Sequence, residues 1–139
     1  MRVWLSLGVG LVLVMAAACG QVSASGGGDK QEPRRNFVMI FDLPCAQVAA
    51  QVRAKLKSDP ALGLAGEKKI QRGWAFTLPP RQQPPLRWKT TVLVQCPGPA
   101  SSRLEVRVNT ERLGEKGWAA AGGDPKRENA ILDKITPRP

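Results

Sequence analysis

The chain has 139 residues, a net charge of +10 and neither histidine nor tyrosine. Without histidine, Ser-His and Cys-His nucleophile pairs and histidine-ligated metals are excluded. The length suits one domain with a modest core, and the positive charge favours anionic partners such as lipid headgroups, phosphorylated glycolipid, cell-wall polymer or nucleic acid.

The N-terminus has the organisation of a secretory signal. Arg2 gives a short positive start, residues 3–15 form a nearly unbroken apolar run, and three alanines precede Cys19. This stretch is shorter than the roughly twenty residues that a membrane-spanning helix needs. A cleaved signal peptide over 1–18 is therefore predicted in preference to a retained anchor.

The end of this signal resembles the lipobox of bacterial lipoproteins, in which small residues precede an obligatory cysteine. Ala17, Ala18 and Cys19 fit that pattern, whereas Ala16 stands where leucine is usual. The resemblance implies that Cys19 becomes the first residue of the mature protein and carries the lipid, including palmitate, that anchors it to a membrane. Ordinary cleavage nearby is the alternative.

The residues after Cys19 bear on localisation. Gly20 and Gln21 lack the aspartate that, by the same resemblance, retains many lipoproteins in the inner membrane. An outer-membrane, periplasm-facing location is therefore favoured, with the inner membrane and the cell surface as alternatives. Export also makes nucleic acid the least favoured anionic partner. Residues 19–36 are rich in Ser, Gly and charge, so they are predicted to form a flexible tether.

Two cysteines remain once Cys19 is assigned to the lipid. Cys45 and Cys96 form an even pair in an oxidising compartment, and a disulfide between them is predicted. It would close a loop of about fifty residues and contribute roughly 4 kcal/mol on the chain-entropy model. The alternative is two buried thiols.

A strand and a helix are predicted at the start of the folded part. Residues 37–43 are a short run of aromatic and branched side chains, typical of a buried strand. Pro44 suits the first turn of a helix, and apolar residues then recur at helical spacing from Cys45 to Leu56. Asp59 and Pro60 place the helix end near Ser58.

Three later segments alternate between apolar and polar residues, namely 70–78, 86–96 and 103–110. This period of two predicts an antiparallel sheet with one face on a core and one face wet. In the first segment the predicted core face consists of Ile70, Trp74, Phe76 and Leu78.

Loops are predicted over the proline- and glycine-rich residues 79–85, 97–102 and 113–123. A final helix begins at Pro125, with Asp124 as its N-cap, and ends before Pro137.

The predicted order of elements is β-α-β-β-β-α. Packing both helices on the apolar face of the sheet gives a two-layer α+β domain over residues 37–136. Cys45 on the inward face of the first helix and Cys96 on the inward face of strand 86–96 agree with the predicted disulfide.

This pattern resembles the helix-grip domains of small bacterial envelope lipoproteins. An opening strand, an amphipathic helix, strands bearing Trp74 and Trp88 and a closing helix with Ile131, Leu132 and Ile135 carry the likeness. The C-subunit lipoprotein of the outer-membrane β-barrel assembly machine has such domains. The resemblance implies a non-catalytic accessory or scaffold role in which the domain contacts envelope proteins.

Catalysis is not predicted. The fates assigned to the cysteines remove thiolate chemistry. Two carboxylates among Glu105, Glu111 and Glu115 could serve a glycosidase-like mechanism, but solvated surface acids are the simpler explanation. No metal ligands or cofactor motifs are identified either.

Two binding hypotheses follow. The first is an envelope accessory subunit that contacts a protein partner, with Trp118 as a candidate aromatic anchor unless it folds back over the sheet. The second is a domain for an anionic envelope ligand, a lipid headgroup or an acidic glycan, held in the groove between sheet and helices or on the wet sheet face. The candidate residues on that face are Arg87, Lys89, Arg103 and Arg107. A solvated face that keeps strands from aggregating is the simpler explanation of these cations.

Overall fold

The computed structural model describes residues 38–138. The predicted signal peptide 1–18, the lipidation site Cys19, the tether 19–36 and the start of the first strand at Phe37 lie outside the described residues.

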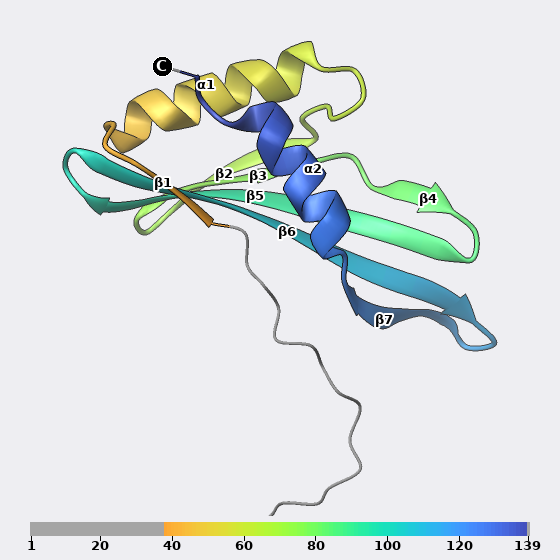
Figure 1. Cartoon of the computed structure of the whole chain (residues 1–139). Helices are drawn as coiled ribbons and strands as arrows, with labels where there is room; N and C mark the ends of the chain where they lie inside the picture. The colour runs from red at the N-terminus through yellow and green to blue at the C-terminus, as the bar shows by residue number, and fades with distance from the viewer. Residues whose placement is uncertain (1–37, 139) are drawn as a thin grey trace, which may run out of the picture. The chain divides into compact units, whose positions relative to one another are not determined.

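Seven strands and two helices form the described domain (Figure 1). In chain order they are β1 (Val38–Phe41), α1 (Cys45–Ser58), β2 (Gly66–Ile70), β3 (Gly73–Thr77), β4 (Arg81–Gln83), β5 (Leu86–Gly98), β6 (Ser101–Gly114), β7 (Gly117–Gly123) and α2 (Pro125–Ile135). The strands run in the order β1-β6-β5-β3-β2, with β4 beside β5 and β7 beside β6. Every pairing is antiparallel, and both helices lie on one face, so the predicted α+β class is confirmed.

The predicted strand 70–78 is wrong, because this region contains two strands. β2 and β3 form a hairpin around Gln71 and Arg72, and Ile70 pairs with Gly73. Ile70 therefore lies on the opposite face of the sheet from Trp74, although the alternation in the sequence placed both on the core face. Gly73 is required here, since its φ is +142° and a Cβ would lie 1.9 Å from the Val94 carbonyl oxygen. β2 was not recognised as a strand because it contains several charged residues, which are common in strands at the edge of a sheet.

All three predicted loops also contain strand residues. β5 and β6 extend into the predicted loop 97–102 and leave only Pro99 and Ala100 as the turn. β4 lies within 79–85, and β7 occupies most of 113–123, where it pairs with an extension of β6 beyond the predicted 103–110. The predicted order β-α-β-β-β-α is therefore wrong by three strands. Glycine and alanine in β7 gave no alternation, and its strand form depends on pairing with β6.

The hydrophobic core lies between the helices and the sheet face that they cover. α1 contributes Val48, Ala49, Val52 and Leu56, at the predicted helical spacing. α2 contributes Ile131, Leu132 and Ile135, and Asp124 caps it by accepting the Arg127 N–H at 3.0 Å. The sheet supplies the remaining buried apolar side chains, chiefly Phe76, Leu78, Trp88, Val92, Val94, Leu104, Val106 and Val108.

Glu128 closes a gap along β6. β1 pairs with β6 as far as Glu105, and β7 begins to pair at Asn109, which leaves the edge between them without a described strand partner. A Glu128 carboxylate oxygen accepts the Val108 backbone N–H at 2.8 Å in a buried hydrogen bond. Because an unpaired buried amide costs about 1–3 kcal/mol, this contact fixes α2 on the sheet.

The structure joins Cys45 to Cys96 by a disulfide, as the sequence predicts, with their Cα atoms 5.4 Å apart. The bond connects the first residue of α1 to β5 across 51 positions of sequence. It therefore holds the start of α1 against the end of the central strand β5.

Replacing both cysteines, in a Cys45→Ala/Cys96→Ala variant, is expected to lower the free energy of unfolding by about 4 kcal/mol, because the unfolded chain regains the entropy of the open loop. Urea unfolding of the mature protein measures the change. The wild type under reducing conditions should match the variant. Two reactive thiols in the denatured, unreduced wild type, beyond any at Cys19, would contradict the bond.

Candidate functional site

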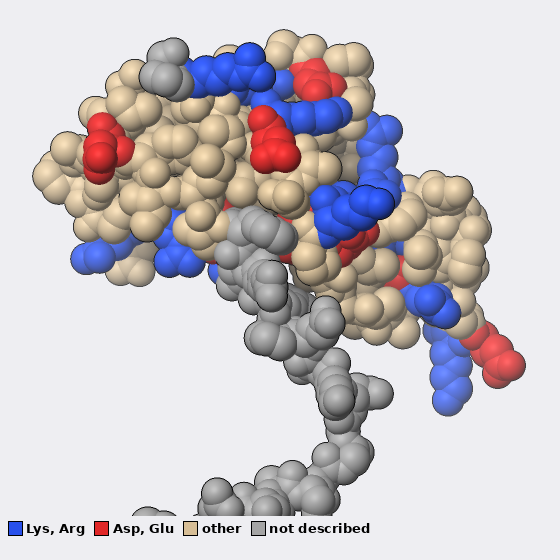
Figure 2. Space-filling model, viewed as in Figure 1, with Lys and Arg blue, Asp and Glu red and all other residues tan. Residues whose placement is uncertain are grey.

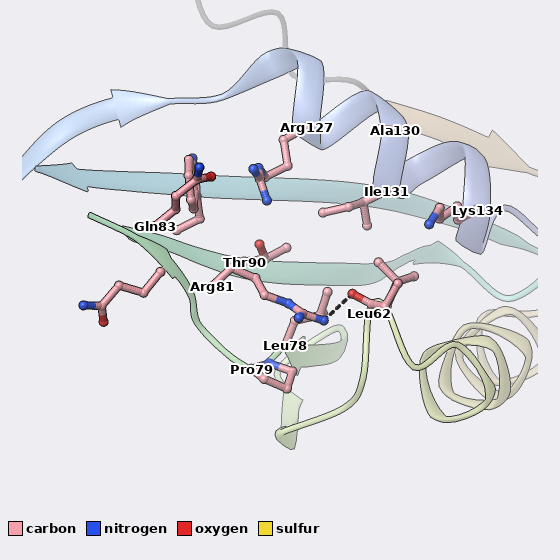
Figure 3. A pocket seen from close by; sticks show the side chains of 13 residues that line it. Leu62, Leu78, Pro79, Arg81, Gln83, Thr90, Arg127, Ala130, Ile131 and Lys134 are labelled. Carbon is pink, nitrogen blue, oxygen red and sulfur yellow. Dashed lines mark hydrogen bonds between the residues drawn. The ribbon is translucent and has the colours of Figure 1, made fainter. Parts of the chain in front are cut away.

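A pocket of about 450 Å³ opens between α2, the loop after α1 and the β4–β5 hairpin (Figure 3). Its volume lies within the range of small-molecule sites. The lining residues are Ala61, Leu62, Leu78, Pro79, Arg81, Gln82, Gln83, Trp88, Thr90, Arg127, Ala130, Ile131 and Lys134.

The pocket exists because the helices do not cover the whole inner face of the sheet. α1 ends at Ser58, and the following turn is held by Asp59, whose carboxylate accepts the Ala61 N–H at 2.7 Å. Pro79 and Pro80 then separate β3 from β4, which pairs only with β5 among the described strands. This end of the sheet therefore faces a hollow instead of a helix.

The inner surface of the pocket is part apolar and part polar. Leu62, Leu78 and Ile131 are buried side chains of the core that border it. Thr90 is only 6% exposed, and its hydroxyl points into the hollow from β5 (Figure 3). The surface thus combines apolar contact with one hydroxyl that donates or accepts a hydrogen bond.

Three cations stand around the pocket. Arg127 and Lys134 extend from α2, and Arg81 extends from β4. Figure 2 shows basic side chains over α2 and in the space beside it toward β4. No Asp or Glu occurs among the lining residues, so the pocket favours an anion.

The contacts of these cations leave donor capacity for a ligand. The Arg127 guanidinium lies 4.0 Å from the centre of the Trp88 ring, which fixes its direction. Its ion pair with Asp124 is 3.5 Å, and that of Lys134 with Asp59 is 3.8 Å. Arg81 donates to the Ala61 carbonyl, as the dashed line in Figure 3 shows. Exposed ion pairs this long contribute little, and a ligand anion competes with them easily.

The sequence-predicted cations lie elsewhere, on the sheet face away from the helices, and each is paired with an acid. Arg87 and Lys89 both contact Glu111, with Lys89 Nζ 2.9 Å from a carboxylate oxygen. Arg103 and Arg107 both contact Glu105, at 3.8 and 2.6 Å. The face therefore consists of two partly neutralised clusters instead of four free cations.

Glu105 and Glu111 organise these clusters. Glu105 is 1% exposed although it lies on the predicted wet face, and two flanking arginines compensate its burial. Hydrogen bonds from Lys89 and Arg87 hold the pKa of the Glu111 carboxyl below its ordinary value of 4.5. The stability that this cluster contributes is complete above the unfolded pKa and is lost as the pH falls through the lower folded pKa.

Trp118 lies in β7 opposite Leu113, against the outer face of the sheet. The Arg87 guanidinium is 4.5 Å from the centre of its ring, and the side chain is half-buried. Trp118 is therefore neither fully exposed nor fully covered, and part of its ring stays accessible to a partner. Leu113 beside it is 46% exposed, so the hairpin still presents apolar surface.

Sequence reasoning identified a groove between sheet and helices but not the residues that line it. Thr90 was the one clue to this lining in the sequence. It is the only hydroxyl residue among the inward-facing positions of the predicted strand 86–96. Arg127 and Lys134 lie seven positions apart and so share a side of α2. Arg81 reaches the pocket because it lies in β4, a strand that the sequence did not indicate.

Comparisons with known protein families, curated proteins and solved structures gave no match for this chain. Within residues 38–138, no helix is long and apolar enough to cross a membrane. The same residues contain no group of three or more cysteine or carboxylate side chains placed to hold a metal ion. The geometry of the pocket is therefore the main evidence on function.

Proposed function

We propose that this protein is a membrane-anchored, non-catalytic envelope lipoprotein that binds an anionic, partly apolar ligand in the pocket between the sheet and α2. The observation that carries this proposal is the set of three cations, Arg81, Arg127 and Lys134, around a partly apolar hollow whose lining contains no carboxylate. Lipid headgroups, phosphorylated glycolipids and acidic glycans suit such a pocket, because each combines negative charge with an apolar or sugar surface.

The sequence supports the envelope part of this proposal. A signal over 1–18, a lipobox-like Cys19 and a tether over 19–36 would place the domain beside a membrane. We assign it to the periplasmic side of the outer membrane, where anionic amphiphiles are accessible to a tethered domain. The inner membrane and the cell surface are the alternative locations.

The pocket is preferred to the outer sheet face for a physical reason. Its cations lie around one concave surface, so a single anion can contact more than one of them. Three of the four outer-face cations lie within 2.9 Å of Glu105 or Glu111, whereas the ion pairs of Arg127 and Lys134 are 3.5 and 3.8 Å long. An anion therefore competes with weaker contacts in the pocket than on the outer face.

Octyl phosphate is a simple probe of the pocket. Replacing two pocket cations, in an Arg127→Ser/Lys134→Ser variant, is expected to weaken its binding by at least about tenfold, because hydrogen bonds to charged groups contribute about 1.5–3 kcal/mol each. Isothermal titration at low salt measures this on residues 19–139 carrying Cys19→Ser, which removes the anchor.

The matched control replaces Arg72 and Lys116 by Ser. Both cations lie at exposed hairpin turns, and neither lines the pocket. This variant loses the same charge and should bind octyl phosphate as the parent does. Equal losses in the two variants would mean that only net charge matters, and no binding by the parent would contradict the proposed site.

The anchor is tested directly at the mature N-terminus. Mass spectrometry of protein purified from membranes is expected to find a chain that begins at an acylated Cys19. A Cys19→Ala variant should be retained in unprocessed form or released from the membrane. An unmodified cysteine or an intact signal in the wild type would refute the lipoprotein assignment.

An accessory role in an envelope protein complex is the second candidate function. The β6–β7 hairpin extends beyond the helices (Figure 1) and carries the exposed Leu113 next to Trp118. Tryptophan at such a position is typical of the residues that dominate protein interfaces. The resemblance to helix-grip envelope lipoproteins points to the same role.

Crosslinking in native membranes followed by purification is expected to recover a defined envelope complex if this second function holds. A Leu113→Ser/Trp118→Ala variant should lose the partner, because the apolar contact area is removed. Ile40→Ser is the control, since Ile40 is 75% exposed on β1, away from that hairpin. Recovery of the protein without any partner would exclude the accessory role.

A further inference from the structure

A second hollow, of about 420 Å³, lies next to the pocket on the helix side of the domain. It is lined by Gln51, Lys55, Ser58, Asp59, Lys134 and Arg138. Lys134 lines both hollows and is 52% exposed, so it lies on the ridge, by which we mean the surface shared by the two hollows.

Positive charge also dominates the second hollow. Lys55, Lys134 and Arg138 surround it, and Asp59 is the one acid in its lining. Asp59 is already engaged, because one carboxylate oxygen accepts the Ala61 N–H and the other lies 3.8 Å from Lys134 Nζ. The hollow therefore has more cations than its own carboxylate can neutralise.

The cations of the second hollow are crowded as well. Lys55 Nζ donates to the Thr136 carbonyl, which holds the amine beside the residue that follows α2. Burial and the charge of Arg138 lower the pKa of Lys55 below its ordinary value of 10.5. A bound anion would relieve this repulsion.

We infer that the ligand carries two anionic groups joined by a partly apolar body, one group held in the pocket by Arg81 and Arg127 and the other in the second hollow by Lys55 and Arg138. Lys134, on the ridge, contacts the body or either group. This inference rests on the proposed function, since it assigns the chemical class of the ligand of the same pocket.

The arrangement favours two anions over one for a geometric reason. A single phosphate or carboxylate occupies part of one hollow and makes no contact with the cations of the other. A ligand that spans the ridge gains the second contact as an intramolecular step, at a high effective concentration. Bisphosphorylated glycolipid headgroups and short acidic glycans both have this form.

Matched probes with one and two charged ends test the inference on residues 19–139 carrying Cys19→Ser. Octane-1,8-diyl bisphosphate is expected to bind at least about tenfold more tightly than octyl phosphate, because both ends are held. Octanedioate and octanoate form the corresponding carboxylate pair, which distinguishes a phosphorylated source from an acidic glycan. A gain in either pair supports the inference.

Arg138→Ser is the variant of choice, because this residue is exposed in the last described segment and its loss leaves the core unchanged. It should reduce the affinity for the bisphosphate to that for octyl phosphate, whose binding stays as in the parent. Lys55→Met gives the same expectation, with a thermal melt to confirm folding. Arg72→Ser is the control for net charge.

Three results would contradict either this inference or the proposed function. Equal affinities within both probe pairs would overturn the inference while leaving the proposed pocket intact. A bisphosphate gain that survives Arg138→Ser and Lys55→Met would also overturn it, because the second group would then bind elsewhere. If no probe binds, the proposed function fails first, and the two failures are thereby distinguished.

Discussion

The fold depends on covering the apolar inner face of two long strands with two short helices. β5 and β6 have 13 and 14 residues and so extend about 45 Å, whereas α1 and α2, with 14 and 11 residues, are about 21 and 17 Å long. The helices bury the centre of the strands and leave one end open. The disulfide at Cys45 and the buried contact of Glu128 fix where each helix lies. The candidate pocket is the part of the inner face that remains uncovered.

The distribution of charge follows from the same arrangement. On the outer face, neighbouring strands bring Arg87 and Lys89 beside Glu111, so cross-strand pairs neutralise much of the basic character. On the helix side, α2 brings Arg127 and Lys134 to a concave surface whose lining has no acid. A net charge of +10 therefore says little about the location of an anion site. The positions of the acids relative to the cations decide it.

Local patterns predicted the helices and the long strands well. The 3.6-residue spacing of α1 and the Asp124 and Pro125 start of α2 are properties of neighbouring residues, and the structure has both elements as predicted. The alternation in strands 86–96 and 103–110 correctly indicated the inner face. β2, β4 and β7 were missed because they are charged, short or rich in glycine, and they form strands by pairing with β3, β5 and β6. Ile70 was placed on the wrong face because the turn at Gln71 and Arg72 reverses the chain.

The sequence by itself determined the α+β class, the two helices, the core face of the central strands and an even pair of cysteines at compatible positions. These features depend on the periodicity of apolar residues and on the number of cysteines, and both are properties of the sequence itself. Tertiary structure alone decided that the predicted basic face is paired with Glu105 and Glu111 and that Arg81, Arg127 and Lys134 surround Thr90. These residues are up to 53 positions apart in the chain. Their meeting depends on strand register and on how far each helix reaches, and neither is a property of any local stretch.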